Sequence, residues 1–316
     1  MKQSTQSVGK LLSLFSLLAL LSVGFVSCSS DDDDFVNPGQ GKPSTSAGLL
    51  DKSTGLRITS VGSYSFEYDS KGRLDYVKTS SSRGYRFSYN PNKIYYNDSE
   101  KEAFLVGYND SGYLASMSYT ASESGEELTG MATLSYDDEG HLVQVNQTYT
   151  ETENEYGKRY KGTEQSTLTL TWKNGLLTKA IDKWTWKDDE ESGTETLTWT
   201  FEYSDNAMEN YYNKYLQMAQ SVLRPIDIDD NFPYIGYIGL FGKGPKYLPS
   251  SAQCEKKRDD RQGNRQSQNQ NTQTYNFDYG FNNDGSINYC SFNGSRQYYT
   301  YDHSGGSSHK APLVVH

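Results

Sequence analysis

Apolar or aromatic residues alternate with Thr, Ser or charged residues in many short runs of this chain. The clearest runs are residues 64–68, 85–89, 168–172 and 197–203, which read YSFEY, YRFSY, LTLTW and LTWTFEY. A period of two places the large side chains on one face of a β-strand and the polar ones on the other. With about fifteen such strands, the pattern predicts an all-β fold, an antiparallel up-and-down meander curled into a barrel or half-barrel.

Two segments depart from this alternation. Residues 206–223 place apolar and aromatic side chains at helical spacing, and Pro225 follows them, so they predict one inserted α-helix. The helical stripe consists of Met208, Tyr211, Tyr212, Tyr215, Ala219, Val222 and Leu223. Residues 232–249, FPYIGYIGLFGKGPKYLP, are the most apolar stretch after the N-terminal region. Because a curled sheet needs its apolar face covered, we expect both segments to pack on its concave face.

A short motif recurs at residues 66–74, 106–114, 134–142 and 279–287: an aromatic residue, Asp or Asn, two variable residues, Gly, one more, then Leu or Ile. Asp or Asn at the first position and Gly at the fourth are preferred in a type I turn, where Gly adopts the positive φ that rejoins the ladder. The motif therefore predicts β-hairpins with structural turns at Gly72, Gly112, Gly140 and Gly285. Each copy has too few carboxylates for a calcium loop, and the irregular spacing excludes a solenoid.

The N-terminus has the features of a secretion signal. Residues 1–27 contain Lys2 and Lys10, then an uncharged apolar run over residues 11–26, and they end just before Cys28. The sequence GFVSC resembles the end of a lipoprotein signal peptide, which implies that Cys28 is acylated, with palmitate among the attached chains. The residue three positions before the cysteine is Phe25 rather than the usual Leu. The alternative is an ordinary secretory signal that is cleaved near Ser27.

Directly after Cys28 the chain reads SSDDDD: Ser29, Ser30, Asp31, Asp32, Asp33 and Asp34. This cluster resembles the export tag of Bacteroidetes lipoproteins, which implies a lipid-anchored protein exposed on the surface of the outer membrane. The alternative is a solvated acidic linker. Residues 28–50 then form the lipidated tag and a flexible tether, residues 51–302 one barrel domain, and residues 303–316 a polar tail.

Composition narrows the partners. The formal net charge is −10, and without a strong basic face the sequence predicts no nucleic-acid partner. Besides Cys28 the chain has Cys254 and Cys290, which could form a disulfide in an oxidising compartment or be two buried thiols.

Candidate chemistry is sparse. The four histidines lack metalloprotease spacing, and no nucleophile motif is present. Asp227, Asp229 and Asn231 alternate like calcium ligands but lack the Gly and distal Glu of a calcium loop. We therefore predict no catalytic residue, no metal and no cofactor. The acidic runs at 123–127 and 188–193 could hold a glycosidase pair, but they are more typical of solvated hairpin tips.

Four aromatic residues could form a platform for sugars: Trp184, Trp186, Trp199 and Phe201. Their alternation is in phase with the apolar face of the predicted strands, which favours a place in the core.

Two resemblances extend this interpretation. YDSKGRL resembles the YD repeat of RHS-type proteins, although only the local hairpin is shared. The lipoprotein start, these hairpins, the Tyr-rich segment near Tyr211 and GLFGKGPKYLPSS at residues 239–251 together resemble a Bacteroidetes surface-lipoprotein family with a porin-like barrel fold. That family brings no catalytic residues.

The expected function is that of a non-enzymatic cell-surface lipoprotein that binds a glycan or another envelope component, or has a structural role. The alternative is a glycan hydrolase on the secreted side with a carboxylate pair in its loops. A transmembrane porin is disfavoured because the alternating strands look short and because a lipid anchor with a surface tag would be redundant.

Overall fold

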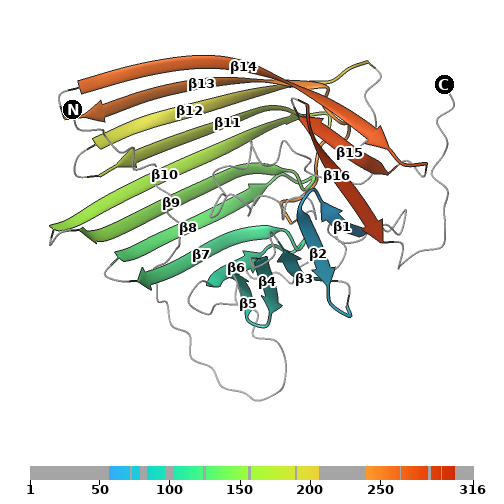
Figure 1. Ribbon diagram of the computed structural model, residues 1–316, viewed down its shortest axis with the longest axis horizontal. Helices are drawn as coiled ribbons and strands as arrows, with labels where there is room; N and C mark the ends of the chain where they lie inside the picture. The colour runs from blue at the N-terminus through green and yellow to red at the C-terminus, as the bar shows by residue number, and fades with distance from the viewer. Residues whose placement is uncertain are drawn as a thin grey trace.

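The computed structural model describes residues 57–71, 73–78, 84–96, 103–123, 126–155, 158–188, 191–205, 240–263, 265–283, 286–292 and 294–302. These residues form a closed barrel of sixteen antiparallel strands, in which each strand pairs with its neighbours in sequence and β1 pairs with β16 (Figure 1). The strands are β1 (Arg57–Val61), β2 (Tyr64–Tyr68), β3 (Leu74–Lys78), β4 (Gly84–Tyr89), β5 (Asn92–Tyr96), β6 (Ala103–Tyr108), β7 (Leu114–Glu123), β8 (Glu126–Tyr136), β9 (Leu142–Glu155), β10 (Lys158–Lys173), β11 (Leu176–Lys187), β12 (Glu191–Glu202), β13 (Ser251–Gln262), β14 (Arg265–Phe281), β15 (Ile287–Phe292) and β16 (Ser295–Asp302).

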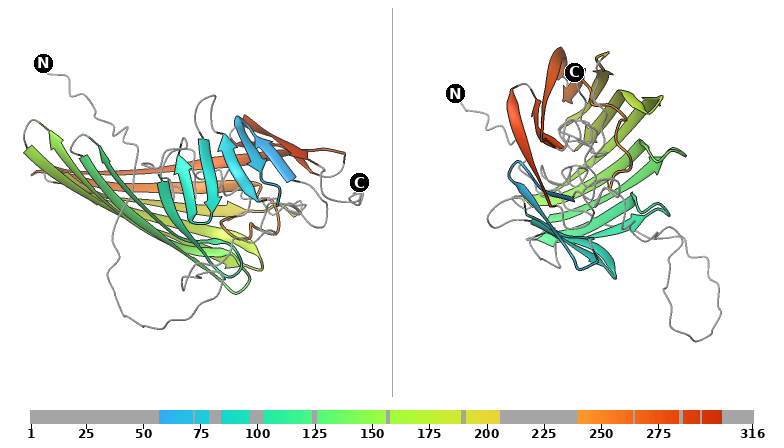
Figure 2. Two further views of the ribbon diagram at one scale, coloured as in Figure 1. Left: turned by 90° about the horizontal axis from the view of Figure 1, so that it is seen from below. Right: turned by 90° about the vertical axis from the view of Figure 1, so that its right-hand side faces the viewer.

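The meander predicted from the sequence is confirmed, and the structure closes it. Strands β1 to β6 have five or six residues each. Strands β7 to β14 have 10 to 17 residues. The long strands therefore run well beyond the short ones at one side of the barrel, and their inner face forms a curved wall there (Figure 2, left).

The two faces of the long strands have opposite character. On β10, Leu168 and Leu170 point inward and are buried, whereas Thr169 and Thr171 point outward and are exposed. The buried apolar side chains of all sixteen strands form one core cluster on the inner face. The period-two pattern of the sequence is therefore the pattern of a barrel that is apolar inside and polar outside.

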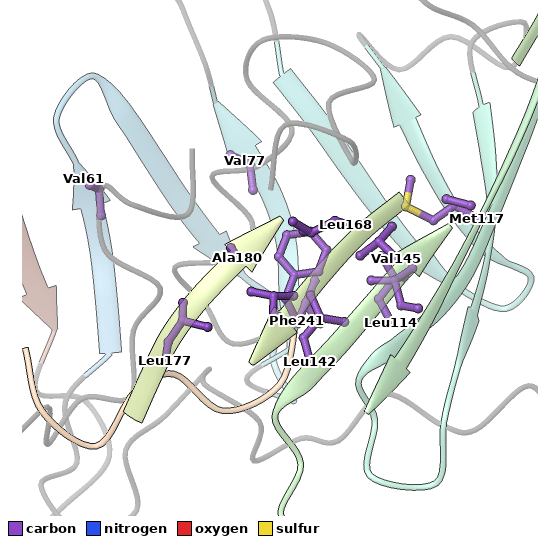
Figure 3. Packing of buried hydrophobic residues seen from close by; sticks show 14 of the residues in the cluster. Val61, Val77, Leu114, Met117, Leu142, Val145, Leu168, Leu177, Ala180 and Phe241 are labelled. Carbon is purple, nitrogen blue, oxygen red and sulfur yellow. The ribbon is translucent and has the colours of Figure 1, made fainter. Parts of the chain in front are cut away.

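A segment that is not a strand helps to fill this core. Phe241 is fully buried and packs among Leu142, Val145 and Leu168 (Figure 3). Its neighbour Leu240 accepts a hydrogen bond through its carbonyl oxygen from the backbone N–H of Leu114, at 2.8 Å. The C-terminal part of the predicted apolar cover thus packs on the inner face, as expected. The predicted helix at 206–223 and residues 232–239 lie outside the described residues.

The repeated motif forms the hairpin turns that the sequence predicts. In the turn after β8, the carboxylate Oδ1 of Asp137 accepts the backbone N–H groups of Glu139 and His141, at 3.0 and 2.8 Å. The backbone N–H of Gly140 also donates to the carbonyl oxygen of Asp137 at 3.0 Å, which closes a type I turn. Gly112 and Gly140 have φ angles of 78° and 90°. Gly72 and Gly285 lie outside the described residues.

Six aromatic residues at or next to the end of a strand have a second role. Each side chain donates a hydrogen bond to a backbone carbonyl oxygen near the start of the preceding strand, so that it ties its own strand to the preceding part of the barrel. These inter-hairpin bonds are Tyr68 to Ile58 at 2.6 Å, Tyr89 to Leu74 at 2.7 Å, Tyr136 to Leu114 at 2.6 Å, Trp172 to Leu142 at 2.8 Å, Tyr203 to Leu177 at 3.0 Å and Tyr301 to Ile287 at 3.0 Å. Burial raises the pKa of the Tyr89 and Tyr203 hydroxyls, so these groups stay protonated and continue to donate.

The two cysteines outside the N-terminal region are free thiols, and both are buried. Cys254 pairs with Gln273 of β14, and Cys290 pairs with Tyr279 of the same strand. Six residues of strand separate these partners by roughly 20 Å. A disulfide needs Cα atoms within about 7 Å, so the disulfide that the sequence left open does not form.

Candidate functional site

Beyond the apolar core, the inner face of the long strands changes to polar and aromatic side chains. Strand register aligns Gln147 of β9, Ser166 of β10, Trp184 of β11, Glu195 of β12 and Arg258 of β13 in one row across the wall. A second row beside it consists of Tyr149, Glu164, Trp186, Gly193 and Asp260. We call these two rows together the inner belt.

The centre of the inner belt is a stack of three side chains. The rings of Trp184 and Trp186 lie 4.6 Å apart between centroids, tilted by 34°, and the guanidinium of Arg258 lies 4.8 Å from the centroid of the Trp186 ring. Gly193, directly opposite Trp186, makes this position possible. A Cβ atom at Gly193 would lie 2.2 Å from Cζ2 of Trp186, so any larger residue would displace the ring.

Charged groups hold this stack in place. The indole Nε1 of Trp184 donates to Oε2 of Glu164 at 3.1 Å. Nε of Arg258 donates to both carboxylate oxygens of Asp260 at 2.9 Å. Hydrogen bonding to Asp260 raises the pKa of Arg258, although burial acts in the opposite direction. The geometry of the stack is therefore set before any ligand arrives.

Glu195 is the most buried charged group of the inner belt, with 2% of its side chain exposed. Nζ of Lys256 lies 2.6 Å from its Oε2, and Nη1 of Arg258 lies 3.5 Å from the same atom. A buried carboxylate is strongly unfavourable unless cations compensate it, and two cations do so here.

The inner belt also contains two buried polar side chains that have no hydrogen-bond partner in the described part of the chain. They are Gln147 and Ser166, which face each other across β9 and β10 and are 2% and 6% exposed. An unpaired buried polar group destabilises a fold by about 1–3 kcal/mol. Core packing alone does not explain why these two unpaired polar side chains are buried on the inner wall.

The sequence located the aromatic part of this site but not its charged part. Trp199 and Phe201 belong to the buried core, as the alternation favoured. Trp184 and Trp186, on the next strand, lie further along the wall and are only half-buried. Glu164 and Glu195 were not predicted, although each is in phase with inward apolar residues of its strand, which is a signal that the sequence contains.

The other candidate residues take structural places or lie outside the described residues. The ring of His141 stacks on Trp172 with centroids 4.3 Å apart, and its Nδ1 lies 3.1 Å from Oδ2 of Asp137, so it supports a turn. Residues 227–231 and the three histidines of the C-terminal tail lie outside the described residues, as do Cys28 and residues 29–34. Among the described residues, no group of three or more His, Cys, Asp or Glu side chains could hold a metal ion.

Most outward positions of the strands β9 to β12 are polar. Among the described residues the large apolar side chains that are exposed are Leu105, Met131 and Tyr298. A barrel embedded in a bilayer carries a continuous outward apolar band, about 25 Å high. The sequence predicts short strands, and this prediction is wrong for β7 to β14. What bears on the transmembrane-porin hypothesis is instead that the apolar side chains point mainly inward. Separately, the described part of the chain contains no helix of the length and apolar character needed to cross a membrane.

Comparisons with known proteins add little to this geometry. No protein-family model matches the chain, and a search of curated proteins finds no match. A solved structure of a porin-like protein from Bacteroides uniformis is similar, with 18% sequence identity and a TM-score of 0.44 over 78% of this chain and 96% of that chain. The assignment of a sixteen-strand barrel rests on the strand pairing described above.

Proposed function

We propose that this protein is a non-enzymatic, lipid-anchored protein of the outer membrane surface, and that its inner belt binds a glycan. The observation that carries the proposal is the half-buried Trp184–Trp186 stack on the inner wall, surrounded by charged hydrogen-bonding groups. Aromatic rings offer apolar contact to the C–H faces of a sugar ring, while carboxylate and guanidinium groups fix its hydroxyls.

The state of the carboxylates supports binding over hydrolysis. A glycosidase needs one carboxyl group as proton donor and a second as nucleophile or base. Glu195 is engaged by two cations, and Glu164 accepts the indole N–H of Trp184. Neither carboxylate is therefore arranged to give a proton to a leaving group.

The polar outer face supports a barrel that is held at the membrane by an anchor rather than embedded in it. Threonine and lysine at outward positions are unfavourable against lipid tails. A lipidated Cys28, followed by the acidic tag and the tether of residues 28–50, would hold the domain outside the bilayer.

A glycan array tests the binding proposal. The mature protein should be retained by a defined set of glycans, and Trp186→Ala should weaken retention at least tenfold. Tyr298→Ala is the matched control, because it removes a half-exposed aromatic side chain from the outer face. Equal retention by Trp186→Ala and the control would refute the inner belt as the site. Release of reducing ends from a bound glycan would favour the hydrolase.

The anchor requires a separate experiment. Radiolabelled palmitate should be incorporated into the wild-type chain but not into Cys28→Ala, and protease added to intact cells should digest the wild-type protein. Replacing Asp31–Asp34 by Asn should abolish protease access without affecting labelling. An unlabelled wild-type chain would instead support an ordinary secretory signal.

A further inference from the structure

The outer face of the long strands carries a second feature, independent of the inner belt. Along β10 and β11, five lysines point outward, away from the core. They are Lys161, Lys173, Lys179, Lys183 and Lys187, and we call them the lysine row. All five are exposed.

Along the middle of β9 to β12, opposite charges are sorted between the two faces of the wall, whereas β13 carries Glu255 and Asp259 at outward positions. Within residues 144–152, 161–173, 179–187 and 192–200, every second residue points outward. Apart from the lysines, these outward residues are Thr, Ser, Gln, Asn and one Ile, and none is acidic. The carboxylates of the same strand segments, including Glu164, Asp182 and Glu195, lie at inward positions. In a chain with a net charge of −10, four adjacent strand segments whose outward positions carry five cations and no carboxylate are an unusual arrangement.

Four members of the lysine row have no ion pair within the described part of the chain: Lys173, Lys179, Lys183 and Lys187. The lysines of β13 differ, because Lys256 and Lys257 contact Glu195 and Glu255 at 2.6 and 3.0 Å. These four lysines are therefore available to an anion outside the protein.

The row is linear. Lys179, Lys183 and Lys187 are four residues apart on one strand, which separates successive ammonium groups by roughly 13 Å. Within residues 144–152 and 192–200, the outward positions of β9 and β12 contribute no further cation, only hydroxyl and amide groups, and the exposed Glu202 follows at the end of β12. An anion that meets all three lysines must be extended along the strand direction.

We propose that the lysine row binds an extended anionic polysaccharide lying along β11, with the Thr side chains of β10 and β12 bonding its hydroxyls. A bilayer surface is a poorer fit because Ile181 is the sole apolar side chain among these outward positions, whereas membrane-bound surfaces insert apolar and aromatic groups. Single-stranded nucleic acid is a poorer fit because these positions offer no aromatic ring on which a base could stack.

Calorimetry tests this proposal by measuring how tightly a heparin decasaccharide binds to the mature protein at several salt concentrations. The triple variant Lys179→Gln, Lys183→Gln, Lys187→Gln should weaken binding at least tenfold and flatten its salt dependence, because fewer counterions are released. The matched control is a second triple variant, Lys78→Gln, Lys93→Gln, Lys257→Gln. It removes the same charge from outward positions of other strands and should change the affinity less than threefold.

Several outcomes would overturn the proposal. Equal weakening in both triple variants would mean that the anion responds only to net charge. Tighter binding of single-stranded DNA than of the decasaccharide would assign the surface to nucleic acid, and binding only to anionic vesicles would assign it to the membrane. The Trp186→Ala variant should bind the decasaccharide normally, so that failure of this proposal and failure of the inner-belt proposal are distinguishable.

Discussion

Three glycines allow backbone strain and side-chain crowding to be measured separately. Gly162 lies within β10 with no atom within 4 Å of an added Cβ and no positive φ; Gly263 has the same free space but a φ of 56°. Gly140 has a φ of 90°, and an added Cβ would lie 3.1 Å from Cε2 of Tyr113. The Tyr113 ring packs against Tyr136 with centroids 5.3 Å apart, so it has little freedom to move.

The expected free energies follow from these differences. Replacing Gly by Ala stabilises by about 0.5–1 kcal/mol through the unfolded chain wherever the backbone tolerates Ala, so Gly162→Ala should be neutral or stabilising. Holding Ala at a positive φ costs about 1–2 kcal/mol, which exceeds the stabilisation through the unfolded chain. Gly263→Ala should therefore destabilise the protein by about 0.5–1 kcal/mol. Crowding against Tyr113 adds about 1–2 kcal/mol, so Gly140→Ala should destabilise by about 2 kcal/mol.

Equilibrium urea unfolding of the three variants measures these values from the shift in midpoint at constant slope. The order of stability should be Gly162→Ala, then Gly263→Ala, then Gly140→Ala. If Gly140→Ala were as stable as Gly162→Ala, the turn described for the repeated motif would be wrong.

Three further variants test other parts of the fold. Tyr136→Phe removes the donor that satisfies the carbonyl of Leu114 and should destabilise by about 1–3 kcal/mol in chemical unfolding, whereas Tyr298→Phe on the surface should not. Phe241→Ala empties a fully buried site and should destabilise by about 3–5 kcal/mol; an unchanged melting temperature would remove this segment from the core. Burial acts to raise the pKa of Asp137, but hydrogen bonds from His141 and Glu139 outweigh it and lower the pKa below 3.8. The stabilisation is therefore present above pH 4 and is lost as the pH falls through the folded-state pKa, so Asp137→Asn should lower the melting temperature at pH 7, and its difference from the wild type should shrink as the pH falls below 4.

The fold was largely predictable because its signals are local. Alternation along a strand and the Asp-to-Gly turn each depend on fewer than ten residues, and both are readable in the printed sequence. Closure was not predictable, because the pairing of β1 with β16 joins residues such as Ser60 and Thr300, and no short pattern encodes it.

The candidate site was predictable only in part, for a related reason. Trp184 and Trp186 are visible as an aromatic pair on one strand, but the partners that fix them come from β10, β12 and β13. The position of Trp186 depends on Gly193, which by itself reads as a residue of a hairpin tip. The inter-hairpin bonds could not be predicted from the motif, because the turn alone explains why each copy has Asp or Asn and Gly at fixed positions.

Those tyrosine bonds bear on the order in which the chain assembles. Tyr68 and Tyr136 reach back only 10 and 22 residues, so each new hairpin can dock on one that has already formed, at a small entropic cost. The seam between β1 and β16 brings together residues 240 positions apart and gains nothing until every intervening hairpin is in place. Folding should therefore spread along the chain as a growing open sheet, with closure as the final and slowest step. Until then, both edge strands remain open to pairing with another copy of the chain.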